Sequence, residues 1–159
     1  MRWLVLSLAL APQCSWALSC LPWGVTNAYV AAEKSENSFV PVQGTLTFYS
    51  RDLPVVDMTR QDKAPPLTKI EARFDGHALG RRSDTALSVE VVLEVACFGL
   101  WCSRPKPGEI LGFLRQDGDI YALATDPCGG FLFGSPDGAD VQQMRECVGG
   151  GACQPVGWE

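Results

Sequence analysis

The chain has 159 residues, a length that suits one domain preceded by a short leader. It is 47% hydrophobic and 19% charged, which excludes a disordered tail and a coiled coil. Its formal net charge is −5 and its basic residues form isolated pairs, so we expect no binding to nucleic acid.

The first seventeen residues have the organisation of a secretion signal. Residues 3–11 form an apolar run after a positive start, and Ser15 and Ala17 are small residues of the kind that a signal peptidase recognises. The run is shorter than the roughly 20 residues of a membrane span, so we expect no span. The sequence therefore predicts a signal peptide over 1–17 and one exported domain, periplasmic or secreted, over 18–159.

The cysteine count is consistent with this cleavage. Of seven cysteines, Cys14 lies in the leader. The even number that remains indicates a disulfide framework in an exported chain. The alternative is a lipid anchor at Cys20, although Ala17 stands where a lipoprotein signal usually has a branched aliphatic residue. The six cysteines after the leader are Cys20, Cys97, Cys102, Cys128, Cys147 and Cys153.

Regular patterns begin soon after the leader. Thr26 is expected to cap a short helix over 27–34. The segments 51–66 and 77–84 are rich in Pro, Asp and Arg, and we predict that they are loops. Alternation of apolar and polar residues predicts three half-buried antiparallel strands, over 43–49, 68–74 and 87–95.

A β-hairpin is predicted next. Its strands cover 110–115 and 120–124, and Asp117-Gly118 between them is a strong turn signal. Both faces of these strands are apolar, so we expect the strands to be central in the sheet or covered on both sides. Residues 131–133 are predicted to form a last short strand.

The chain ends with the pattern of a helix. Ser135-Pro136 is typical of a helix start, and Gly149 is expected to end the helix. The apolar residues Val141, Met144 and Val148 recur at helical spacing. About five strands with a helix near each end predict a mainly β protein, built as a small closed antiparallel barrel.

The order of cysteines and elements resembles a known family. Cys20-Leu21-Pro22 follow the leader, then come a short helix and an expected strand within residues 39–48. Cys97 follows the third strand and Cys128 follows the hairpin. This order resembles netrin-like domains, OB-fold barrels that include the tissue inhibitors of metalloproteinases. The sequence also resembles small exported bacterial envelope proteins.

The resemblance implies an OB-like barrel held by three disulfides. It implies that Cys20 bonds to Cys128, and proximity in the sequence then favours Cys97 with Cys102 and Cys147 with Cys153. The metalloproteinase inhibitors begin Cys-x-Cys, and their first cysteine presents its α-amino group to zinc. The matching places here are Leu18-Ser19-Cys20, so inhibition of a zinc protease does not carry over to this chain.

The segment Cys97 to Cys102 allows two interpretations. As a redox dithiol it would supply a thiolate nucleophile, but it lacks the two-residue spacing, the helix start and the basic neighbours that lower a thiol pKa. As a disulfide-closed loop it displays Phe98 and Trp101. We favour the second interpretation and keep a thiol–disulfide redox protein as the alternative function.

Other catalytic chemistry has little support in the sequence. His77 is the single histidine and lies in an expected turn, and the nucleophile-elbow motif Gly-x-Ser-x-Gly is absent. Glu90 and Glu94 lie on the polar face of a predicted strand, where we expect water to solvate them. The cysteine spacings are not those of a zinc finger. We predict no catalytic residue, no metal site and no cofactor.

Aromatic side chains are the remaining functional signal. Trp23, Trp101 and Trp158 stand beside Gly or Cys in expected loops or near the end of the sequence. Aromatic residues on rigid loops suit protein recognition. The sequence therefore predicts a non-enzymatic binding or adaptor domain that acts on another envelope or secreted protein, in an inhibitor-like manner, through Trp23, Phe98 and Trp101.

Overall fold

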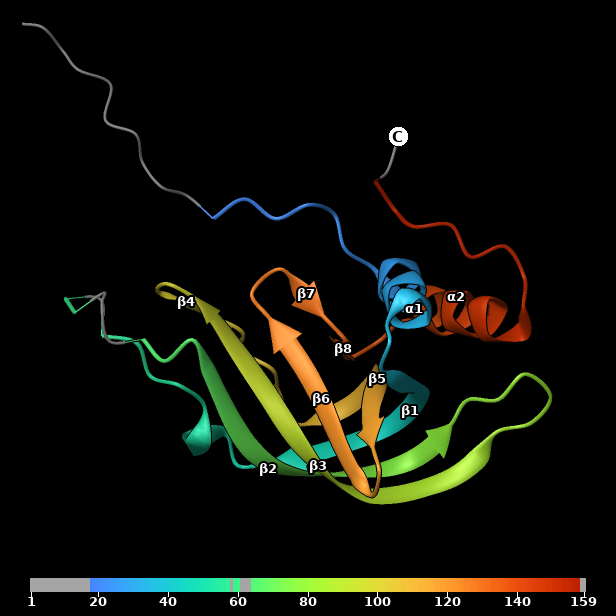
Figure 1. The fold of residues 1–159 in the computed structure, drawn as a ribbon, viewed down its shortest axis with the longest axis horizontal. Helices are drawn as coiled ribbons and strands as arrows, with labels where there is room; N and C mark the ends of the chain where they lie inside the picture. The colour runs from blue at the N-terminus through green and yellow to red at the C-terminus, as the bar shows by residue number, and fades with distance from the viewer. Residues whose placement is uncertain (1–17, 58, 61–63, 158–159) are drawn as a thin grey trace, which may run out of the picture.

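The structure is a computed structural model, and it describes residues 18–57, 59–60 and 64–157 (Figure 1). The expected signal peptide, 1–17, and Trp158 lie outside these residues. No helix in the described ranges is long and apolar enough to cross a membrane.

Two helices and eight strands, with one short 3-10 helix, make up the described fold. In chain order they are α1 (Val25–Lys34), β1 (Ser38–Phe48), η1 (Ser50–Asp52), β2 (Leu67–Ala78), β3 (Thr85–Phe98), β4 (Trp101–Cys102), β5 (Gly108–Asp117), β6 (Ile120–Asp126), β7 (Gly129–Gly130), β8 (Leu132–Gly134) and α2 (Gly138–Gly149).

Five long strands form a closed barrel in the order β3-β2-β1-β5-β6, and β6 returns to pair with β3. This arrangement confirms the mainly β, OB-like barrel with a helix near each end. One detail differs, because β3 and β6 run parallel while the other barrel pairs are antiparallel. A ring with an odd number of strands cannot alternate direction all the way round, so one pair must be parallel.

The alternating residues fill the barrel. On β2 the side chains of Ile70, Ala72 and Phe74 are buried while their neighbours are exposed, as the period of two predicts. β1 adds Leu46, and β3 adds Leu93. Each strand therefore presents one apolar face to a common interior.

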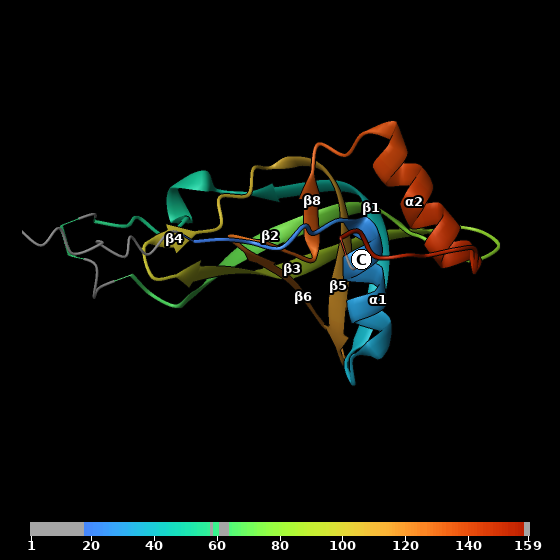
Figure 2. The same cartoon turned by 90° about the horizontal axis from the view of Figure 1, so that it is seen from above.

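A second core lies between the barrel and the two helices, which cover one side of it (Figures 1 and 2). Strand β5 serves both cores, because Ile110 and Leu114 face the barrel interior while Leu111 and Phe113 pack with the helices. Met144 of α2 is fully buried there. This confirms that the strand 110–115 is covered on both faces.

Strand β2 extends beyond its predicted end. The expected loop 77–84 is wrong at its start, because residues up to Ala78 are strand, and His77 pairs with Gln43 and Ala86 instead of lying in a turn. Gly76 suggested the turn, yet it lies opposite Gly44 on β1. A Cβ at Gly76 would stand 2.4 Å from the carbonyl oxygen of Gln43, so this glycine permits a close approach of two strands.

Both predicted helix starts are also wrong. Helix α1 begins after Gly24, and the side chain of Asn27, not Thr26, accepts the Gly24 N–H at 3.1 Å. Helix α2 begins after Asp137, whose carboxylate accepts the N–H groups of the next turn. Asp137 is the cap in place of Ser135 because an N-cap residue is extended, as Asp137 is, whereas Ser135 has a φ of 52°. The expected end at Gly149 is confirmed.

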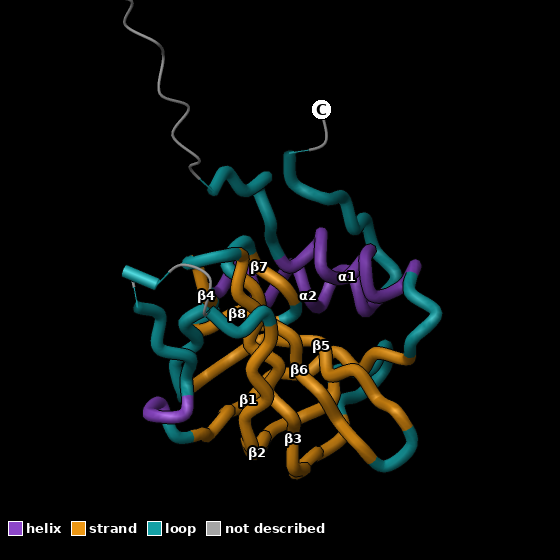
Figure 3. The backbone as a smooth tube through the Cα atoms, turned by 60° about the vertical axis from the view of Figure 1, so that its left-hand side comes forward, coloured by secondary structure: helices purple, strands orange, loops and turns teal. Residues whose placement is uncertain are grey.

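Asn27 holds two distant segments together. Besides Gly24, its Oδ1 accepts the N–H of Val156 at 3.1 Å, and its Nδ2 donates to the Val156 carbonyl at 3.1 Å. The side chain is 4% exposed, so these bonds are shielded from water. The segments before α1 and after α2 therefore lie close together over the helices (Figure 3).

Candidate protein-binding surface

Three disulfides join the cysteine pairs that the sequence and the family resemblance suggested. They are Cys20–Cys128, Cys97–Cys102 and Cys147–Cys153. Three disulfides in a chain of this size indicate folding in an oxidising environment. Two of these bonds, Cys20–Cys128 and Cys97–Cys102, position the surface described next.

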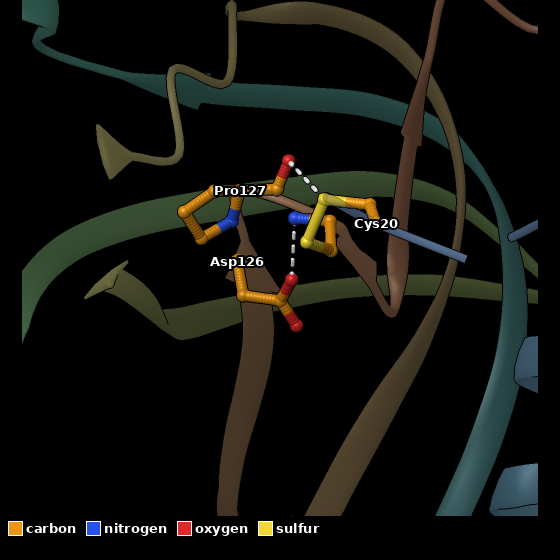
Figure 4. Close-up of a disulfide and its surroundings, with 4 residues drawn as sticks. Cys20, Asp126 and Pro127 are labelled. Carbon is orange, nitrogen blue, oxygen red and sulfur yellow. Dashed lines mark hydrogen bonds between the residues drawn. A yellow bond between two sulfur atoms is a disulfide. The ribbon is translucent and has the colours of Figure 1, made fainter. Parts of the chain in front are cut away.

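The Cys20–Cys128 bond attaches the segment before α1 to the end of β6 (Figure 4). The turn that carries Cys128 is fixed by its N–H, which donates to Oδ1 of Asp126 at 2.7 Å. A few residues along, the indole N–H of Trp23 donates to the Gly130 carbonyl at 2.8 Å. The residues from Leu18 onward are thus held against the barrel.

The second bond closes the hairpin of β3 and β4. Cys97 pairs with Cys102 and Phe98 pairs with Trp101, so each pair shares one face of the ribbon. Gly99 makes the turn with a φ of 61°, a conformation that glycine adopts without steric cost. Cys97 is buried, whereas Phe98 and Trp101 are 44% and 45% exposed.

A hollow of about 420 Å³ adjoins this hairpin. Leu18, from the segment before α1, and Trp101, from β4, both line it. Leu100 and Pro127 add apolar surface, and Arg104 and Asp126 add charge at its edge. The structure thus joins the hairpin and the segment that the Cys20–Cys128 bond fixes into one surface, which we call the hairpin surface: Leu18, Phe98, Leu100, Trp101 and Pro127.

Trp23 does not belong to the hairpin surface. It borders a different hollow, along α1, and its ring lies so close to Gly129 that a Cβ there would stand 2.2 Å from the indole. Its indole N–H is already bonded. The predicted binding set is therefore divided: the structure brings Phe98 and Trp101 together, and it places Trp23 at a separate site.

A basic segment that was not among the predicted binding residues lies beside the hairpin. Arg104 and Lys106 are exposed, whereas Ser103 and Pro105 between and before them are buried. The two cations therefore project from the same side of this proline-containing segment. The hydroxyl groups of Ser103 and Thr125 are 2.7 Å apart and hold this segment to β6. In the sequence, the available signal was the alternation of two cations with Ser103 and Pro105.

Of the two strand carboxylates, one behaves as predicted and one does not. Glu90 is exposed, with 75% of its side chain accessible, and pairs with Arg73. Glu94 is buried, which makes the expected solvated position wrong. Arg115 crosses from β5 and donates to both oxygens of Glu94 at 3.1 Å. Glu94 pairs with Ala124 on β6 and Arg115 pairs with Ala122 on the same strand, so β6 brings the two charged residues close together.

We expect Glu94→Gln to lower the free energy of unfolding by about 2 kcal/mol, because it leaves Arg115 partly desolvated without a counter-ion. Glu90→Gln on the same strand is the matched control, and its loss should stay below about 1 kcal/mol because that pair is exposed. Urea unfolding of both variants measures the difference. Equal losses would show that burial of Glu94 has no energetic consequence.

A second polar network lies on the outer face of β2 and β3. Ser88 donates directly to Asp75, and this bond, followed by that from Arg73, holds the pKa of Asp75 below its ordinary value. Within the described residues no three potential metal ligands gather into one site.

The hairpin surface and its neighbouring cations are suited to binding another protein. This region offers a fixed apolar surface, two neighbouring cations at Arg104 and Lys106, and a hairpin whose cysteines are bonded to each other. Comparison with known proteins found no matching family model, no matching curated protein and no matching solved structure.

Proposed function

We propose that the chain is an exported, non-enzymatic binding domain that acts on another envelope or secreted protein through the hairpin surface. The observation that carries this proposal is the exposed pair Phe98 and Trp101, paired across a hairpin that the Cys97–Cys102 bond closes. Aromatic side chains dominate the energy of many protein interfaces. A closed hairpin loses little conformational entropy when a partner binds, so more of the contact energy appears as affinity.

We further propose that residues 1–17 are cleaved on export to the periplasm or the medium, and that the domain is related to netrin-like domains. The sequence of residues 1–17 supports export, as do the three disulfides. The Cys20–Cys128 bond supports the kinship, as does Cys97, which lies at the end of the third strand, within it and not after it as expected. Inhibition of a zinc protease is not part of the proposal, because Leu18 stands in the place of the required cysteine.

The thiol–disulfide alternative would use the same hairpin. Reactive cysteines in oxidoreductases are accessible and lie at helix starts or beside cations. Here Arg104 lines the same hollow as Cys102, but Cys97 is 7% exposed and both cysteines lie on strands and not at a helix start. A structural bond therefore explains this pair better than a catalytic one.

Photocrosslinking tests the binding proposal. A photoreactive phenylalanine analogue placed at Trp101 in the exported protein is expected to give a covalent adduct with one protein partner. The same group at Ile120, which is 61% exposed at the opposite end of β6, is the matched control and should give none. Equal adducts from both positions would contradict a specific hairpin surface.

The double variant Phe98→Ser/Trp101→Ser should then weaken binding to that partner about 100-fold, because each exposed aromatic residue at an interface centre contributes on the order of 1 to 2 kcal/mol. Its unfolding midpoint should barely change, since neither side chain is in a core. Disulfide exchange activity that disappears in Cys97→Ser would instead support the redox alternative.

A further inference from the structure

A second hollow, separate from the hairpin surface, lies along helix α1 and has a volume of about 380 Å³. Four of its residues follow the spacing of one helical face, so they form a continuous stripe along α1. Trp23 borders it from the segment before the helix, and Pro155 borders it from the segment after α2. The stripe consists of Asn27, Val30, Ala31 and Lys34.

Most polar groups around this hollow are already bonded within the protein. The Trp23 indole N–H donates to Gly130, and the Asn27 amide bonds to Gly24 and Val156. These groups have little capacity left for a ligand, so Val30, Ala31, Trp23 and Pro155 present an essentially apolar surface.

Lys34 is the exception. It lies at one end of the stripe, and no carboxylate among the described residues lies within ion-pairing distance of its ammonium group. Its neighbour Glu33 accepts a hydrogen bond from Tyr29 at 2.9 Å, which holds that carboxylate toward another side of the helix. The hollow thus combines an apolar length with one unpaired positive charge at its end.

We propose that this hollow binds an aliphatic carboxylate, with its hydrocarbon chain along Val30, Ala31, Trp23 and Pro155 and its carboxylate on the ammonium group of Lys34. The chain removes apolar surface from water, and the charge pair fixes its direction. The volume is within the range of small-molecule sites. This ligand site goes beyond the proposed function and does not depend on it, because it uses other residues and another face.

Decanoate, kept below its micellar concentration, is the probe. Calorimetry with the disulfide-bonded protein should show saturable binding of one molecule, and the amide and indole NMR signals of Ala31 and Trp23 should shift with the same dissociation constant. Decylammonium has the same chain with the opposite charge and should bind at least about tenfold more weakly. Equal binding of the two amphiphiles would overturn the role of Lys34, and no saturable binding of decanoate would overturn the site.

Variants separate the two parts of the proposal. Lys34→Met should weaken decanoate binding about fivefold, whereas Lys106→Met, the same change at another exposed lysine, should leave it unchanged. Ala31→Trp fills the hollow and should abolish binding, whereas Ala139→Trp on the exposed face of α2 should not. Circular dichroism and the unfolding midpoint verify that each variant is folded. Decanoate binding that survives Ala31→Trp in a folded protein would show that the chain lies elsewhere.

Discussion

The double variant Cys20→Ser/Cys128→Ser is expected to lose about 4 to 5 kcal/mol of unfolding free energy, since this bond closes a loop with a sequence separation of 108 residues. In the chain-entropy account, a cross-link stabilises by restricting the unfolded chain, and the restriction grows with loop length. Urea unfolding without reductant measures the loss.

The matched control is Cys97→Ser/Cys102→Ser, whose bond spans a sequence separation of only 5 and should contribute about 2 kcal/mol. A larger loss in the control than in the long-loop variant would contradict the entropic explanation. The long-loop variant has a second expected effect. Without the bond, Leu18 is no longer held beside Trp101, so partner binding should weaken even under conditions where the barrel stays folded.

The second large effect is expected at a pair of glycines. In Gly76→Ala the new methyl group would stand 2.4 Å from the Gln43 carbonyl, 2.6 Å from the Cα of Gly44 and 2.9 Å from the Phe74 ring. Backbone atoms of two paired strands cannot move apart without breaking the ladder of hydrogen bonds. We expect a loss of about 3 kcal/mol in unfolding free energy, measured by urea or thermal unfolding.

Gly134→Ala on β8 provides the comparison. A Cβ at Gly134 meets no atom within 4 Å and its φ is not positive, so the change should be within about 0.5 kcal/mol. Gly44→Ala should behave like Gly76→Ala, because each glycine contacts the other strand. A neutral Gly76→Ala would mean that β1 and β2 separate locally at little cost.

Local pattern predicted the strands well where burial alternates. Ile70, Ala72 and Phe74 showed which face of β2 is buried, and two-sided apolarity predicted that both faces of β5 are covered, although not that the helices cover one of them. The end of β2 could not be predicted, because Gly76 looks like a turn residue until Gly44 is known to lie opposite. Likewise, the role of Asn27 could not be predicted. Its side chain accepts the N–H of Val156 as well as that of Gly24, and Val156 lies 129 residues further along the chain.

The candidate surface could also be predicted only in part. Aromatic residues inside a short cysteine loop were visible in the sequence, so Phe98 and Trp101 were identified. The sequence contained no signal that Leu18 reaches the same hairpin or that Trp23 does not, since both facts depend on where β6 ends. The burial of Glu94 depends in the same way on Arg115, a residue on a strand that is not its neighbour in the barrel.

Because β5 contributes side chains to both cores, opening either layer would expose buried apolar residues of the same strand. Separating the helices would expose Leu111 and Phe113, and opening the barrel would expose Ile110 and Leu114. The whole domain should therefore unfold as one cooperative unit. In native-state hydrogen exchange, the backbone amides of residues 110–114 should exchange slowest, and their opening free energy should equal that of global unfolding.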